Sequence, residues 1–189
     1  MNEEDLFLFP TKITIIDNFL SEQECNELVA KAKSLSPQPH PAIEEGLSYH
    51  ERGKFLEDTK STHLMNRLEE IMKRLTESHG YKYKGLDNSW FNIQKPNTIL
   101  YEHTHPCSLL SGALYLQVNE FTTPLSFRNP NPYVFFGAYK NFNDSNFTTY
   151  AIKPEIGSLI VFPSWLQHFV GQNDKETIDR IVLSFNTKN

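Results

Sequence analysis

The sequence predicts a mainly β protein in which N-terminal helices pack outside a β-sandwich or barrel. Hydrophobic residues recur with a helical period of 3.6 in two segments before residue 80. After it, seven or eight short segments show the period of two that is typical of strands. The chain has 189 residues, which fits one domain with a sizeable core. We find no repeat and no change in composition that would mark a second domain.

Composition and charge describe a globular protein. Hydrophobic residues make up 39% of the chain, which is too many for a disordered one. The net charge of -5 argues against nucleic-acid binding, which usually needs a basic surface. Cys25 and Cys107 are far apart and lack metal-ligand spacing, so a reducing compartment is expected. An acidic N-terminus and the lack of a long apolar run argue against a signal peptide and a membrane span, which predicts a cytoplasmic protein.

The first elements are a strand and a helix. Residues 12–17 alternate and are rich in isoleucine, as in a strand. Ser21 and Glu24 form a capping-box pattern that predicts a helix ending near Leu35. Its buried face is predicted to contain Cys25, Leu28, Val29 and Ala32. Cys25 is therefore expected to be a small apolar core residue rather than a reactive one.

A loop and a second helix follow. Residues 36–54 contain three prolines and two glycines, so we expect a loop in which His40 and His50 are surface residues. The second helix is predicted over residues 59–78, with Gly80 as its C-terminal stop. Its buried stripe is predicted to contain Leu64, Met65, Leu68, Met72 and Leu75.

Period-two segments then continue to the end of the chain. Strands are predicted over residues 90–94, 100–105, 109–118, 125–128, 149–152, 158–162, 168–170 and 180–186. Between two of them lies a long aromatic segment with Tyr133, Phe135, Phe136, Tyr139, Phe142, Phe147 and Tyr150. Such a segment is either a binding lid or an ordered hairpin extension that covers a sheet face. Arg128 at its start is a candidate partner for a substrate carboxylate or phosphate.

Three histidines are the candidate metal ligands. His103 and His105 stand two residues apart, so on an extended chain both side chains project from the same face. His168 is the best candidate for a third ligand because it opens a late strand after a turn and a buried strand. A non-haem iron site usually has two histidines and one carboxylate on one face and leaves three positions open.

Arg180 is the candidate anion-binding residue. On the terminal strand it shares one face with Val182, Ser184 and Asn186, while the alternate residues are apolar. An arginine that points into an interior is costly unless it meets an anion, which a guanidinium binds bidentately. The alternative is a salt bridge at the sheet edge. Tyr115 is either a second donor to the same anion or an ordinary core aromatic.

Four segments together carry a family resemblance: residues 103–106 (HTHP), 110–116 (LSGALYL), 157–168 (GSLIVFPSWLQH) and 180–186 (RIVLSFN). In order and spacing they resemble the 2-oxoglutarate- and iron(II)-dependent oxygenases. More narrowly, they resemble small oxygenases of marine bacteria and their phages, which are distant relatives of prolyl 4-hydroxylases. The resemblance implies a double-stranded β-helix, a jelly roll of the cupin type, over residues 86–189. Residues 1–85 would form its helical support within one domain.

The resemblance also implies roles for individual residues. His103 takes the position of the first metal ligand and His168 that of the distal histidine, so iron(II) is the expected metal. Arg180 matches the residue that pairs with the far carboxylate of 2-oxoglutarate. The remaining positions line the pocket or add hydrogen bonds to the cosubstrate, and they are Tyr115, Ser184, Asn92 and Trp90.

One position departs from the family pattern. The usual first segment is His-x-Asp or His-x-Glu, whereas here the second residue is His105. Three arrangements stay open: a three-histidine iron site, a carboxylate supplied from elsewhere, or His105 as the first ligand with His103 as a pocket residue. Glu102 is adjacent, but an extended chain points it to the opposite face.

We therefore expect an oxygenase that hydroxylates a C–H bond with 2-oxoglutarate and O2 as cosubstrates and succinate and CO2 as co-products. A peptidyl, prolyl-like substrate is favoured by analogy alone. The alternative is a cupin-like protein that binds a metal and a small acid without turnover. A third hypothesis is a metal-free jelly-roll interaction domain.

Overall fold

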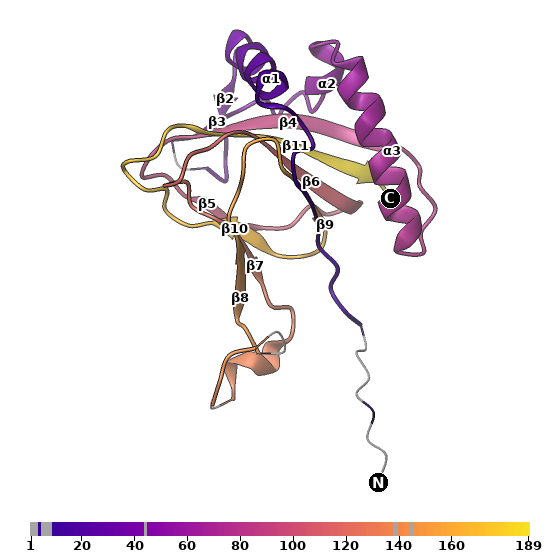
Figure 1. The fold of residues 1–189 in the computed structure, drawn as a ribbon, viewed down its shortest axis with the longest axis vertical. Helices are drawn as coiled ribbons and strands as arrows, with labels where there is room; N and C mark the ends of the chain where they lie inside the picture. Colours follow the sequence, from indigo (N-terminus) through magenta and orange to yellow (C-terminus); the bar gives the residue numbers. More distant parts are fainter. Residues whose placement is uncertain (1–3, 5–8, 44, 138–139, 144–145) are drawn as a thin grey trace.

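The structure is a computed structural model that describes residue 4 and residues 9–43, 45–137, 140–143 and 146–189. Two antiparallel sheets face each other, and helices cover the outer face of the larger sheet (Figure 1). The helices are α1 (Glu22–Ser34), α2 (Phe55–Asp58), α3 (Thr62–Ser78) and the 3-10 turn η1 (Pro132–Phe135). This arrangement confirms the prediction of a mainly β jelly roll with N-terminal helices.

The larger sheet has seven strands. In spatial order they are β1 (Thr14–Ile16), β9 (Leu159–Pro163), β6 (Ser108–Gln117), β11 (Arg180–Lys188), β4 (Leu86–Gln94), β3 (Leu47–Ser48) and β2 (Gln38–Pro39). The smaller sheet has four strands in the order β5 (Leu100–His103), β10 (His168–Val170), β7 (Leu125–Arg128) and β8 (Thr149–Ile152). The bounds of β7, β8 and β10 agree with the prediction from the sequence, and β5 ends two residues earlier than expected.

Helix α1 begins as its sequence predicts. The Ser21 side chain accepts a hydrogen bond from the Glu24 backbone N–H, and the Glu24 carboxylate accepts one from the Ser21 backbone N–H at 2.8 Å. This capping box satisfies N–H groups that the first turn of a helix cannot pair internally. Cys25 and Ala32 on the buried face are fully covered, so the apolar role predicted for Cys25 is confirmed.

Helix α3 buries the predicted stripe against the larger sheet. Leu68 and Met72 are fully buried, whereas Met65 at the edge of the stripe is only half-buried. Just past the end of the helix, Gly80 has a φ of 81°, which a glycine adopts without steric cost. The helix begins three residues later than predicted because the short helix α2 occupies residues 55–58, just before it.

Strand β11 separates two hydrophobic clusters. It lies between β4 and β6, and its Ile181, Leu183 and Phe185 pack in the cluster beneath the helices. Val182 points the other way, into the cluster between the two sheets. The alternation predicted from the sequence is therefore confirmed. The strand supplies an apolar outer face for the helices and an inner face that carries Arg180 and Ser184.

Strands β7 and β8 form a hairpin that projects away from the body of the molecule (Figure 1). At its tip Tyr133 and Phe136 are 77% and 80% exposed. The segment is a hairpin extension, as one alternative expected, but the expectation that it covers a sheet face is wrong because the hairpin points away from both sheets. Tyr139 of the predicted aromatic set lies outside the described residues. Arg128 at its base forms an ion pair with Glu102 at 2.7 Å, so its guanidinium already has an anionic partner.

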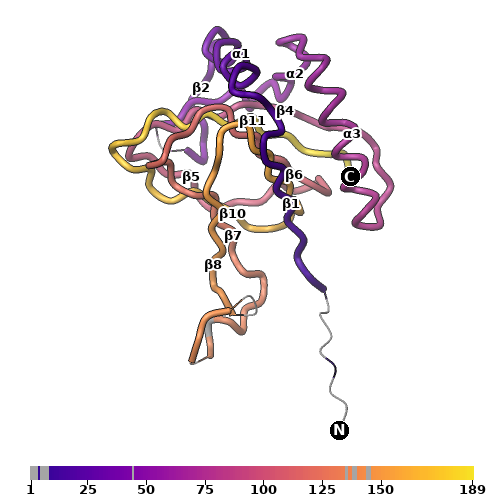
Figure 2. Tube along the Cα trace, in the orientation of Figure 1, coloured from indigo at the N-terminus to yellow at the C-terminus, as the bar shows by residue number. Residues whose placement is uncertain are grey.

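The start of the described chain lies beside a much later segment. Strand β1 pairs with β9 at the edge of the larger sheet, and residues 9–13 before it lead away from the body (Figure 2). Within the part of the chain that the structure describes, no helix is both long enough and apolar enough to cross a membrane.

A close approach in the larger sheet gives a testable prediction. A Cβ built on Gly112 would lie 2.1 Å from the ring of Phe185, its fully buried partner on the neighbouring strand. Gly112→Ala should therefore lower the free energy of unfolding by about 1–3 kcal/mol through overpacking. Chemical denaturation measures this change. Gly171→Ala is the matched control because its added Cβ meets only Thr123, at 3.7 Å, and an equal loss in both variants would contradict the account.

Candidate active site

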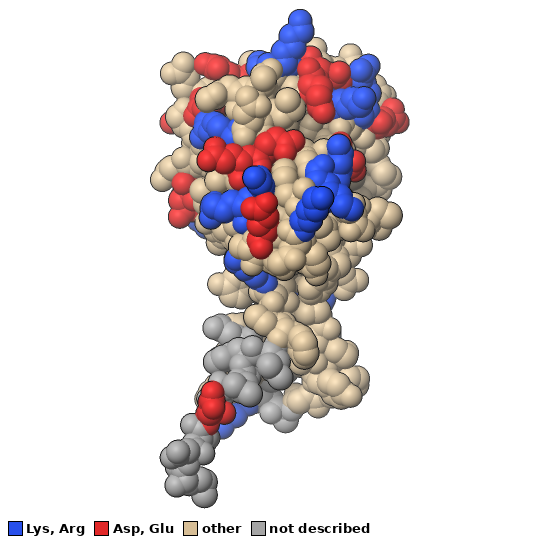
Figure 3. All heavy atoms as spheres, turned by 90° about the vertical axis from the view of Figure 1, so that its right-hand side faces the viewer, with Lys and Arg blue, Asp and Glu red and all other residues tan. Residues whose placement is uncertain are grey.

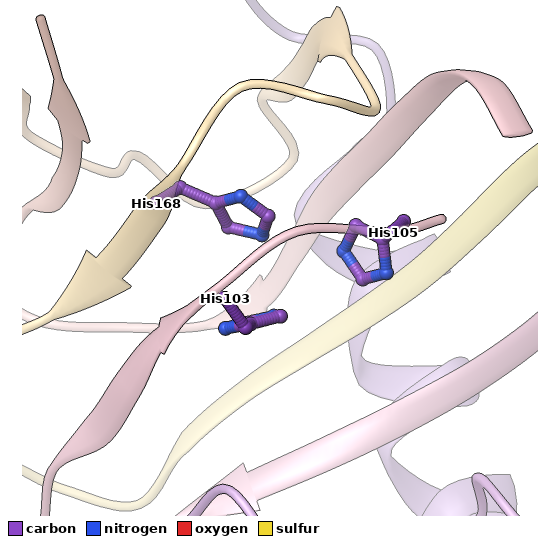
Figure 4. Close-up of side chains that lie close together, drawn as sticks. All are labelled: His103, His105 and His168. Atoms are coloured by element: carbon purple, nitrogen blue, oxygen red, sulfur yellow. The ribbon is translucent and has the colours of Figure 1, made fainter. Parts of the chain in front are cut away.

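Three histidine side chains converge on the wall of a cavity between the two sheets. His103 ends β5 and His168 opens β10, and the two are directly paired across these strands. His105 lies beyond the end of β5, where its backbone N–H donates to the carbonyl of Ser164 at 2.9 Å. His105 is thus tied to the fold outside a continuous strand, and its side chain lies beside the other two (Figure 4).

The three rings are close enough to share one metal ion. Ring centroids are 4.3 Å apart for His103 and His168, 5.0 Å for His105 and His168, and 5.1 Å for His103 and His105. One nitrogen from each ring lies within 4.8 Å of the others. Nitrogen ligands bound to a first-row metal at about 2.1 Å are separated by about 3–4 Å, so a small closure of the rings suffices.

Backbone carbonyls orient two of the rings. The Nδ1 of His103 lies 2.7 Å from the carbonyl of Tyr101, and the Nδ1 of His168 lies 2.9 Å from that of Leu166. Since a carbonyl only accepts hydrogen bonds, each Nδ1 carries the proton and each Nε2 keeps its lone pair. Metal-ligating histidines are held in the same way, with the other ring nitrogen bonded to a carbonyl or carboxylate.

Burial keeps these histidines neutral. Loss of hydration, and to a smaller extent the neighbouring His103, lower the pKa of His168 to about 3 and that of His105 to about 4. Burial also lowers the pKa of His103, against a smaller upward effect of its bond to Tyr101. All three are therefore unprotonated at neutral pH, which is the form that binds metals.

No carboxylate joins this cluster among the described residues. Glu102 is adjacent in sequence, but its carboxylate is bound by the guanidinium of Arg128 at 2.7 Å and 3.2 Å. The prediction that Glu102 points away from His103 and His105 is thus confirmed. The donor set that the structure offers is three neutral imidazoles.

Arg180 lies at another part of the same cavity. Its side chain is 3% exposed, and no carboxylate of the described residues lies within ion-pair distance. Nη1 donates to Gln94 at 3.4 Å and Nη2 to the Tyr115 hydroxyl at 3.3 Å, while Nε has no partner. The alternative interpretation of Arg180, a salt bridge at the sheet edge, is not found among the described residues. A buried guanidinium with an unpaired N–H is suited to an anion from solution.

The other predicted residues fall into two groups. Trp90, Asn92 and Ser184 line the cavity together with Arg180 and the three histidines. Tyr115 is fully buried behind Arg180, with the guanidinium carbon 5.1 Å from its ring centroid. The cavity encloses about 730 Å³ of space not filled by atoms, part of which is open to solvent.

The expectation that His40 and His50 are surface residues is wrong. His40 is half-buried and lines the cavity, and its ring centroid lies 4.7 Å from that of His50. Its Nδ1 accepts a hydrogen bond from the backbone N–H of Ala42 at 3.0 Å. A lone histidine in a proline-rich loop has no second ligand at a metal-binding spacing, so the sequence does not indicate that it belongs to a site. His40 reaches the cavity because β2 and β3 add to the larger sheet.

Charged side chains of both signs are interspersed over the face of the body shown in Figure 3. This view shows no continuous basic surface of the kind that nucleic-acid binding usually needs.

Comparison with known proteins identifies the family. Residues 88–186, more than half of the chain, match the family described as "Putative 2OG-Fe(II) oxygenase". The chain therefore belongs to the 2-oxoglutarate- and iron(II)-dependent oxygenases, an enzyme family whose cofactor pair is iron(II) and 2-oxoglutarate. A search of curated proteins finds no significant match.

Solved structures share the fold at low sequence identity. HygX from Streptomyces hygroscopicus, solved with nickel and 2-oxoglutarate, is 13% identical with a TM-score of 0.68, over 94% of this chain and 83% of that one. A prolyl-4-hydroxylase from Pseudomonas putida is 12% identical with a TM-score of 0.67, over 95% and 94%. A prolyl hydroxylase from Trichoplax adhaerens, in complex with a hypoxia-inducible-factor peptide, is 15% identical with a TM-score of 0.64, over 93% and 83%. These similarities establish the double-stranded β-helix fold.

The ligand set can be tested by substitution. Replacing any one of His103, His105 and His168 with alanine should weaken Ni(II) binding at least about 100-fold, since even the outer partners of metal ligands contribute 10–100-fold. Isothermal titration calorimetry measures the affinity.

Two further variants sharpen the test. Glu102→Gln should leave the affinity unchanged because its carboxylate is paired with Arg128, and His63→Ala on exposed helix surface is the matched control. Weak binding by Glu102→Gln together with normal binding by His105→Ala would show that a carboxylate is the third ligand.

Proposed function

We propose that this protein is a hydroxylase in which His103, His105 and His168 hold iron(II) and Arg180 anchors 2-oxoglutarate. The single observation that carries the proposal is the shared cavity. It joins three neutral imidazoles, two of them oriented by backbone carbonyls, to a buried guanidinium without a carboxylate partner among the described residues. A dicarboxylate that reaches from the metal to Arg180 uses both features at once.

The proposed domain organisation follows the fold. Residues 86–189 form the catalytic double-stranded β-helix, and residues 1–85 form its support. The helices of this support pack on the outer face of the larger sheet, and its strands β1, β2 and β3 extend that sheet at both edges. The core beneath α1 and α3 supports this division, because Leu28 and Leu68 from the helices pack in one cluster with Leu183 of β11. One hydrophobic cluster thus links the support region to the strand that carries Arg180.

Arg180 and Tyr115 act together on the far carboxylate. The guanidinium offers its unpaired Nε–H, and the Tyr115 oxygen already accepts from Nη2, so the phenolic proton remains available for the same anion. Burial raises the pKa of Tyr115, which keeps the phenol protonated. Asn92 and Ser184 line the wall between the two ends and supply further hydrogen-bonding groups.

Apolar residues keep water away from the reacting atoms. Leu100, Leu125 and Phe162 line the cavity beside the histidines. When bound, iron(II) and 2-oxoglutarate supply the oxidising chemistry, in which one atom of O2 enters a substrate C–H bond as hydroxyl and the other enters succinate as CO2 is lost. The chain contributes position, orientation and exclusion of solvent.

The proposed primary substrate is a peptidyl side chain, with proline as the first choice. Prolyl hydroxylases of Pseudomonas putida and Trichoplax adhaerens support this proposal through their shared fold, and the latter was solved with a peptide bound. Since fold alone does not set the substrate, the direct test is turnover with peptides. We further propose a cytoplasmic location because both cysteines are unpaired, which suits a reducing compartment.

Arg180 gives the sharpest test of cosubstrate binding. Arg180→Met should weaken 2-oxoglutarate binding at least about tenfold, because hydrogen bonds to charged groups contribute about 1.5–3 kcal/mol. The affinity for Ni(II) should be unchanged. The free energy of unfolding should be retained or raised, since methionine removes an unpaired buried charge. Competition calorimetry measures the affinities for 2-oxoglutarate and Ni(II). Arg74→Met, on an exposed position of α3, is the matched control.

Turnover decides between an enzyme and a binding protein. Protein loaded with iron(II) should form succinate in proportion to hydroxylated peptide, measured by mass spectrometry as a gain of one oxygen atom. Arg180→Met should lose most of this activity at low 2-oxoglutarate. Tight binding of metal and cosubstrate with no succinate over a broad peptide library would contradict the proposal and favour a non-catalytic binder.

A further inference from the structure

A second pocket adjoins the metal cavity. Trp90 and His105 belong to the walls of both, and their ring centroids are 5.6 Å apart. The remaining wall of the second pocket is mostly polar and includes His50, Asn88 and Asn186. A ligand in this pocket would therefore lie directly beside one of the proposed metal ligands.

The pairing of β4 with β11 places this pocket relative to Arg180. Successive inward pairs are Arg180 with Gln94, Val182 with Asn92, Ser184 with Trp90, and Asn186 with Asn88. At about 3.3 Å per residue, Arg180 and Asn186 are roughly 20 Å apart along the strand. The pocket thus lies at the opposite end of the inner face from Arg180, and His105 beside Trp90 lies between the two ends.

Asn88 and Asn186 present complementary polar groups to this pocket. The Oδ1 of Asn88 is buried without a hydrogen-bond partner. The Oδ1 of Asn186 accepts from the Ser111 hydroxyl at 2.7 Å, and its Nδ2–H groups make no hydrogen bond within the described part of the chain. Because the two asparagines are directly opposite on neighbouring strands, their Cβ atoms are about 5 Å apart. A free acceptor next to a free donor matches the N–H and C=O of an amide group.

A buried nitrogen of His50 and the charge around the pocket both favour a neutral polar ligand. The Nδ1 of His50 on the same wall is also buried without a partner. Among the described residues no lysine or arginine lines the pocket, and the exposed carboxylate of Asp87 lies on its wall. Asp87 has no ion-pair partner within the described part of the chain. A carboxylate or phosphate would be repelled here, so the cosubstrate belongs at the Arg180 end.

We infer that this pocket binds an amide group of the primary substrate, in which Asn88 accepts from the amide N–H and Asn186 donates to its carbonyl. The inference rests on the proposed function and deepens it by naming the chemical class that the pocket selects. Asn88 and Asn186 are then specificity-determining residues. They hold the substrate by an amide while the adjacent side chain enters the cavity.

The test is a titration of protein loaded with Zn(II) and 2-oxoglutarate, followed by nitrogen-15 NMR. The probes are N-acetyl-alanine methylamide and, as an anion that has no amide group, propanoate. The neutral diamide should shift the side-chain amide signals of Asn88 and Asn186 and the indole signal of Trp90 until saturation. The anion should give no saturable shift. Equal responses to the two probes would overturn the inference.

Variants make the assignment specific to Asn88. Asn88→Leu should abolish saturable binding of the diamide, whereas Asn88→Asp keeps an acceptor and should retain it. Asn66→Leu, on an exposed position of α3, is the matched control and should bind normally. Undiminished binding by a folded Asn88→Leu variant would contradict the inference, and spectral dispersion in the same samples reports folding.

The same samples separate this inference from the proposed function. Binding of 2-oxoglutarate is followed through the side-chain signals of Arg180. Failure of 2-oxoglutarate to bind while the diamide still saturates the pocket would overturn the proposed function alone. Normal 2-oxoglutarate binding without any saturable diamide response would overturn the amide pocket alone.

Discussion

The buried charge of Arg180 is the constraint on which the rest of the inner surface depends. A guanidinium that is 3% exposed and has no carboxylate partner among the described residues is destabilising, and even a buried pair often costs more in desolvation than it gains. The chain offsets part of this cost through Tyr115 and Gln94, by long hydrogen bonds of 3.3 Å and 3.4 Å. The unpaired charge is explained if the site binds an anion, because the anion then supplies the missing partner. Functional sites are often less stable locally than the rest of the protein.

Alternate residues of β11 face opposite sides of the larger sheet, and this alternation relates the position of Arg180 to the rest of the fold. Ile181, Leu183 and Phe185 must be covered, and α1 and α3 cover them. The opposite face is then committed to the interior between the sheets, where its residues run from Arg180 to Asn186. The smaller sheet closes over that face and brings His103 and His168 with it, because these two residues are directly paired across β5 and β10. Strand β11 thus contributes core residues on its outer face and the proposed anion-binding residue on its inner face.

Much of this could be predicted from the sequence, and the failures have physical causes. The strands with clear alternation, such as β7 and β10, were predicted with their observed bounds because period and burial agree there. His103 and His105 were predicted to converge through a continuous strand, whereas β5 ends at His103 and a bond to Ser164 positions His105. That contact joins residues far apart in sequence, so no local pattern encodes it. His40 was missed for the same reason, and polar residues such as Asn88 look like surface positions until two strands are paired.

The most direct test of the central claim is an anaerobic titration of the metal-free protein with iron(II) and 2-oxoglutarate, followed by visible absorption. A 2-oxo acid that chelates iron(II) through its keto and carboxylate oxygens gives a weak charge-transfer band. The account predicts this band in the parent protein, its loss in His168→Ala and its appearance only at higher 2-oxoglutarate in Arg180→Met. Metal binding without the band at saturating 2-oxoglutarate would contradict the account, because the histidine cluster and the buried guanidinium would then not hold one shared ligand.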